Sequence, residues 1–121
     1  MKGSAGFNPA FVAITGGTIA NLTSLTLAGS GTTTILAAYH ATVTLTPAAV
    51  AANTTAEQLF AVTNVAVGDV INVNKPTSQA GLGLAGVRVS SAGNIGITFI
   101  NATAASITPT AAEVYQVSGL R

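Results

Sequence analysis

Few side chains in this sequence could take part in acid–base, nucleophilic or metal chemistry. The 121 residues include one histidine, His40, three carboxylates, Glu57, Asp69 and Glu113, and no cysteine. Without cysteine, disulfides, thiolate metal sites and cysteine nucleophiles are excluded. No carboxylate or serine stands at a motif spacing from His40. We therefore interpret it as a surface, interface or hydrogen-bonded histidine, the alternative being a ligand or a pH-sensitive contact. The sequence predicts no enzyme, no metal and no cofactor.

The remaining ionisable residues have structural interpretations. Glu57 and Glu113 each stand two or three positions before an aromatic residue, as expected of solvated charges at strand edges. Asp69 follows Gly68 and is expected to stabilise a turn. Arg88 lies between two valines, so its side chain should point away from the core. It suits an ion pair between subunits with Asp69, Glu57 or Glu113, the alternative being a plainly exposed arginine.

Charge is scarce throughout the chain. Charged residues make up 6% of the sequence, against roughly 25% in a typical soluble domain. The four cations are too scattered to form a patch for nucleic acid. Apolar stretches end well short of the ~18 residues of a membrane span, and no apolar run follows Met1, so neither a membrane partner nor a secretory signal is expected. The neutral surface of Thr, Ser, Asn and Ala either faces water or lies against other subunits.

Alternating apolar and polar residues predict an all-β fold. Asn, Gly and Pro turns separate the segments, and Ser90–Asn94 is expected to join a hairpin. Pro47–Ala52 could begin a helix but is expected to form a single turn or an extended loop. The pattern predicts an antiparallel β-sandwich or small barrel. The expected strands are Thr42–Thr46, Gln58–Val65, Val70–Asn74, Val87–Val89, Ile95–Phe99 and Glu113–Val117.

Residues 1–31 differ from the rest of the chain in their sequence pattern. We expect an extended N-terminal arm that ends in the linker Gly29–Gly31, followed by a compact β-domain over residues 32–121. The short alternations of the arm cannot bury a face within one chain. Either the arm pairs with copies of itself in an oligomer, or it is a loose arm with some extended structure. In the first case its apolar residues would contact the oligomer or a capsid, namely Phe11, Ile14, Ile19, Leu22, Leu25 and Leu27.

Two parts of the sequence resemble bacteriophage virion proteins. Residues 8–19, which end in Ile-Thr-Gly-Gly-Thr-Ile, look like segments common in phage tail fibres, appendages and decoration proteins. The second resemblance is to a small β-domain of phage virion proteins. It is carried by residues 67–70, 74–76, 81–83, 88–90, 97–101 and 108–109.

The resemblance implies a non-enzymatic structural protein on the outer surface of a virion. It points to a homotrimeric capsid decoration (cement) protein, whose partners would be its own copies and the major capsid protein, with no catalytic residues to carry over. The alternative is a tail or fibre component that binds the host surface. Aromatic residues make up only 5% of the chain and tryptophan is absent, which disfavours a glycan site. A bacterial surface subunit unrelated to phage is a third interpretation.

Overall fold

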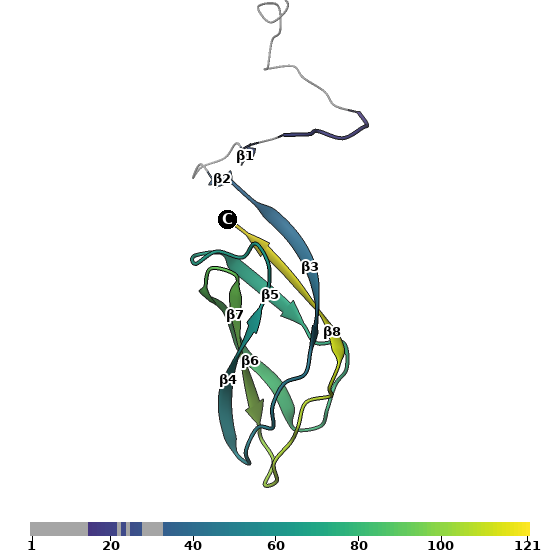
Figure 1. Cartoon of the computed structure of the whole chain (residues 1–121), viewed down its shortest axis with the longest axis vertical. Helices are drawn as coiled ribbons and strands as arrows, with labels where there is room; N and C mark the ends of the chain where they lie inside the picture. Colours follow the sequence, from purple (N-terminus) through teal and green to yellow (C-terminus); the bar gives the residue numbers. More distant parts are fainter. Residues whose placement is uncertain (1–14, 22, 24, 28–32) are drawn as a thin grey trace, which may run out of the picture.

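The computed structural model describes residues 15–21, 23, 25–27 and 33–121. Within these residues the protein is all-β, with no helix, as the sequence predicts (Figure 1). Its strands are β1 (Leu25–Leu27), β2 (Thr33–Ile35), β3 (Ala38–Leu45), β4 (Thr54–Ala61), β5 (Val70–Asn74), β6 (Leu82–Ser91), β7 (Asn94–Asn101) and β8 (Glu113–Leu120).

Two antiparallel three-stranded sheets form a β-sandwich. One sheet has the order β3-β8-β5 and the other β4-β7-β6, so β8 and β7 are the central strands. The connections after β3, β4, β5 and β7 each cross from one sheet to the other, and only β6 and β7 form a hairpin. This resolves the choice between sandwich and barrel in favour of the sandwich.

The core lies between the two sheets. In β8 every second residue is buried, because successive side chains of a strand point to opposite faces. Tyr115 and Val117 face inward from this strand, and Ile95, Ile97 and Phe99 face them from β7; all five have no exposed surface. Burial of these apolar and aromatic side chains is the main source of stability of the sandwich.

The observed strands differ from the predicted ones chiefly at their ends. The segment predicted as Gln58–Val65 is the strand Thr54–Ala61, because the chain turns at Asn53 (φ 52°) and again at Asn64 (φ 73°). Val62 and Val65 lie beyond the strand and are still buried. Residues 47–52 contain no helix but an extended segment, in which Val50 and Ile107 exchange backbone hydrogen bonds.

The predicted hairpin is confirmed. Ser91 pairs with Asn94, and the loop between them contains Gly93 at φ +78°, a conformation that glycine adopts without strain. Both strands of the hairpin are longer than predicted: β6 begins at Leu82 and β7 extends to Asn101.

The N-terminal strands lie outside the sandwich sheets. β1 pairs with β2, from Leu25↔Ile35 to Leu27↔Thr33, in a separate two-stranded sheet. Figure 1 shows this pair beyond the end of the sandwich where the chain finishes. There the backbone N–H groups of Leu36 and Ala37 donate to the carbonyl oxygen of Arg121, at 2.6 and 3.1 Å. The boundary at residue 32 stays a prediction, although Thr33–Ile35 pairs with β1 rather than with either sandwich sheet.

Candidate functional site

Asp69 is the centre of a polar cluster at one end of the sandwich. Its side chain has no exposed surface. It accepts hydrogen bonds from the Tyr39 hydroxyl at 2.7 Å, from Arg121 Nε at 2.8 Å and from the Ala66 N–H at 3.0 Å. The bond to Ala66 is the turn contact that the sequence predicts.

These contacts shift two pKa values in opposite directions. Arg121, and after it Tyr39, hold the pKa of the Asp69 carboxyl well below its usual range. Burial, together with the hydrogen bond to Asp69, raises the pKa of Tyr39 to about 12. Near neutral pH the cluster therefore contains an ionised carboxylate, a guanidinium and a neutral phenol. Through these hydrogen bonds Asp69 links β3, the turn before β5 and residue 121.

Glu113 forms a second ion pair at the other end of β8. It is buried, with a side chain 8% exposed, and lies 2.8 Å from Lys75 Nζ. The Thr77 hydroxyl also donates to it, and Lys75, followed by Thr77, lowers the pKa of Glu113. The prediction that Glu113 is a solvated strand-edge charge is therefore wrong. The interior-facing side of strand β8 starts with Glu113, and the carboxylate remains ionised there because of its two partners.

Arg88 pairs with Glu57 within the chain. Arg88 Nε and a terminal guanidinium nitrogen donate to the two Glu57 oxygens at 2.8 and 2.7 Å, which holds the Glu57 pKa below its usual value. The two residues belong to the edge strands β6 and β4, and the pair crosses the central strand β7 above Gly96. A Cβ at Gly96 would lie 2.7 Å from Glu57 Oε2, so a side chain there would obstruct the pair.

The expected pair between Arg88 and Asp69 is not formed in this chain. Asp69 is occupied by Arg121, and Arg88 lies on the opposite sheet, next to Glu57. Of the three carboxylates considered for Arg88, Glu57 is its partner. Arg88 does point away from the core, as predicted, with its side chain 61% exposed.

All six charged residues in the described part of the chain are consequently paired. The three ion pairs are Asp69–Arg121, Glu113–Lys75 and Glu57–Arg88. Among the described residues no group of three or more His, Asp or Glu side chains could hold a metal ion. Nor does this part of the chain contain a helix of the length and apolarity needed to cross a bilayer.

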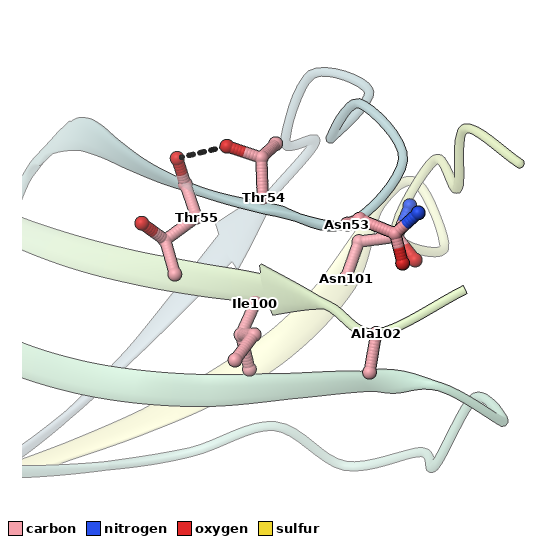
Figure 2. Close-up of a pocket in the computed structure, with 6 residues that line it drawn as sticks. All are labelled: Asn53, Thr54, Thr55, Ile100, Asn101 and Ala102. Carbon is pink, nitrogen blue, oxygen red and sulfur yellow. Dashed lines mark hydrogen bonds between the residues drawn. The ribbon is translucent and has the colours of Figure 1, made fainter. Parts of the chain in front are cut away.

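An open groove lies where β4 begins and β7 ends, with a volume of about 520 Å3 (Figure 2). Asn53, Thr54, Thr55, Ile100, Asn101 and Ala102 line it. The Asn101 amide is already used: its nitrogen donates to the carbonyls of Val50 and Ala105, and its oxygen accepts from Thr103. Thr54 donates to the Thr55 carbonyl at 3.4 Å, the bond drawn in Figure 2. The groove therefore offers hydroxyl groups and apolar surface but no ionisable residue.

The outer surface of the β3-β8-β5 sheet has a different character, and we call it the neutral face. It contains no Asp, Glu, Lys or Arg. Leu120 and Val70, 50% and 74% exposed, make one end apolar. His40 is exposed on β3 near the middle of the face, which places it among the surface histidines that the sequence predicts. Residues that are cross-strand partners form four rows on this face. The rows are Ala38, Leu120 and Val70; His40, Ser118 and Asn72; Thr42, Gln116 and Asn74; and Thr44 and Val114.

The structure describes only part of the predicted contact arm. Phe11, Ile14 and Leu22 lie outside the described residues. Ile19 is 53% exposed, and Leu25 and Leu27 are the first and last residues of β1. The pairing of β1 with β2 shows that part of the arm finds a strand partner within its own chain.

Sequence reasoning expected a neutral surface but did not place it on one sheet, and it missed the partners of Asp69. The alternation in residues 113–120 was a usable signal for the face, because it places Val114, Gln116, Ser118 and Leu120 on one side of a strand. No comparable signal linked Asp69 to Tyr39 and Arg121. Those residues are 30 and 52 positions away and meet only through strand pairing.

Comparisons with known proteins add no family to this description. No protein-family model, curated protein or solved structure matches the chain.

Proposed function

We propose that this chain is a non-enzymatic structural protein of a phage virion, most specifically a homotrimeric capsid decoration protein. One observation carries the proposal: every charged side chain in the described residues is paired within the chain, and one whole sheet face has no charge. A surface without net-charged patches can pack closely against copies of itself and a protein lattice.

The resemblance of residues 8–19 to phage appendage segments supports the virion assignment. In this proposal the N-terminal arm attaches to the major capsid protein and the sandwich projects from the shell. Attachment would stabilise the assembled shell because the protein binds that state alone. The internal pairing of charge also predicts binding that resists salt, since apolar and neutral hydrogen-bonded contacts are screened far less than ion pairs.

The test is co-sedimentation of the purified protein with shells that lack it, at low and high NaCl. We expect binding with little loss at high salt, a trimer in analytical ultracentrifugation, and a projecting density on the shell in electron micrographs. A monomer that fails to bind shells would overturn the proposal. Density at the tail instead of the head would favour the alternative, a tail or fibre component that binds the host surface.

A further inference from the structure

We propose that the edge of β3 beside which no described strand lies, here called the free edge, is a strand-pairing site for β3 of a second copy of this chain. The inference goes beyond the proposed function: it concerns a two-fold contact, whereas a trimer uses other surfaces.

The backbone groups of β3 alternate between β8 and the free edge. Arg121 N donates to Ala37 O at 2.9 Å and Ala37 N donates to Arg121 O at 3.1 Å, so these two residues form a hydrogen-bonded pair. In an antiparallel ladder such pairs recur at every second residue. The register runs without a bulge from Ala38↔Leu120 to Leu45↔Glu113. The N–H and C=O groups that point away from β8 are therefore those of Ala38, His40, Thr42 and Thr44.

Among the described strands of the sandwich, β3 is the edge least protected against pairing. β5 has only five residues, and β6 carries two register shifts, both of which discourage added strands. Beside β4, the Gln58 amide exchanges hydrogen bonds with the Ala48 backbone at 2.7 and 2.9 Å. β3 has eight residues, no proline, no charge and no bulge. It lies along one side of the molecule (Figure 1).

The pattern of free groups on β3 is complementary to itself. In a two-fold antiparallel pair centred on Ala41, Ala38 faces Thr44 and His40 faces Thr42 of the second copy. All four free residues of each copy are then paired, which makes about eight backbone hydrogen bonds. In this register even-numbered residues face even-numbered residues, so the outward side chains of both copies lie on the same side of the sheet. The two neutral faces then join into one six-stranded sheet. No like charges meet, because β3 carries none.

The decisive measurement is residue-resolved amide hydrogen exchange of the full chain at low micromolar and at millimolar concentration. We expect the amides of Ala38, His40, Thr42 and Thr44 to become protected only at high concentration. The amides of Ala41 and Val43 should be protected at both, because they bond to β8. Equal exchange of the four free-edge amides at both concentrations would overturn the proposal, as would protection gained only elsewhere.

Thr42→Pro tests the same contact by removing one free N–H. Proline is tolerated at an edge where its N–H faces solvent, so the ladder to β8 should survive. We expect the two-fold association to weaken by roughly tenfold or more, since each dimer loses two hydrogen bonds and gains two proline rings at the contact. Thr42→Lys, which keeps the N–H but adds a charge at the edge, gives a second measurement if the proline variant does not fold.

Gln116→Lys is the matched control. Gln116 is the cross-strand partner of Thr42, so this substitution adds the same charge to the neutral face, but on the central strand β8 instead of the edge strand. It should associate like wild type. Association lost in the control and kept in Thr42→Lys would place the contact on the face and overturn the edge proposal. A trimer that still binds shells in Thr42→Pro would separate this inference from the proposed function.

Discussion

The Tyr39 ring lies over the backbone of Gly119, its cross-strand partner in the β3-β8-β5 sheet. Gly119 is buried, and the hydroxyl at the far end of the Tyr39 ring donates to Asp69. The glycine thus makes room for the aromatic ring that reaches the ion pair. Covering a strand glycine with a neighbouring aromatic ring is a recognised way of stabilising a sheet.

Gly119→Ala should destabilise the protein, because the new methyl group would overlap the Tyr39 ring and break its bond to Asp69. Overpacking of this kind costs about 1–3 kcal/mol. Gly96→Ala is the matched control: its methyl group meets only the flexible end of Glu57 and should change stability much less. Urea denaturation of both variants checks this. Equal losses would show that the Tyr39 contact has no special role.

Acid should destabilise the fold below about pH 4. The folded-state pKa values of Asp69 and Glu113 are lowered by their cationic partners, so their contribution to stability is complete above the unfolded-state pKa values near 4. It is then lost as the pH falls through the lower folded-state values. Urea midpoints measured from pH 7 to pH 2 should be flat and then fall.

Asp69→Asn should be less stable than wild type at pH 7 and lose less stability in acid. Glu57→Gln is the control, because the Glu57–Arg88 pair is exposed and should add little pH dependence. A wild-type stability that stays constant down to pH 2 would contradict the role of these ion pairs, as would an Asp69→Asn profile parallel to wild type.

Removing the hydroxyl groups of the two tyrosines should affect stability differently. Tyr115 is completely buried, and its hydroxyl has no hydrogen-bond partner among the described residues. Tyr115→Phe should therefore leave the free energy of unfolding unchanged or raise it by up to about 1 kcal/mol. Tyr39→Phe should lower it, because Asp69 loses a donor. Thermal denaturation of the two variants side by side provides the measurement, and a loss in Tyr115→Phe as large as that in Tyr39→Phe would contradict it.

Asn101→Ala should cost about 2–4 kcal/mol. The Asn101 side chain is 1% exposed and joins the residue 102–107 loop to Val50 through hydrogen bonds of 2.8–3.0 Å. Without the amide, the carbonyls of Val50 and Ala105 lose a buried donor. Thr55→Ala, at an exposed position that also lines the groove, is the comparison for groove residues that lack these bonds. Loss of less than about 1 kcal/mol in Asn101→Ala would show that water replaces the amide.

The sequence was sufficient for the fold class because alternation and turn residues report local geometry. The hairpin at Ala92–Gly93 and the strand Val70–Asn74 followed directly from that local pattern. Strand ends were harder to place. Positive φ angles at Asn53 and Asn64 end the pairing of β4, and Asn, unlike Gly or Pro, is only a weak local indicator of such a conformation.

The ion pairs could not be predicted, because they depend on which strands become neighbours. Arg88 reaches Glu57 only because β6 and β4 flank β7, whose residue at that point is a glycine. The environment of Glu113 was misjudged for the same reason: its partners Lys75 and Thr77 lie on a segment that only the tertiary fold brings beside it.

The pairing of every described charge also affects the kinetics of encounter. A molecule whose charges are neutralised at close range produces only a weak field at a distance, so partners are neither attracted nor oriented before contact. Association should then proceed at the unsteered rate of roughly 10^5–10^6 M−1 s−1, nearly independent of ionic strength. For such a protein, local concentration and the fit of neutral surfaces govern how fast a complex forms.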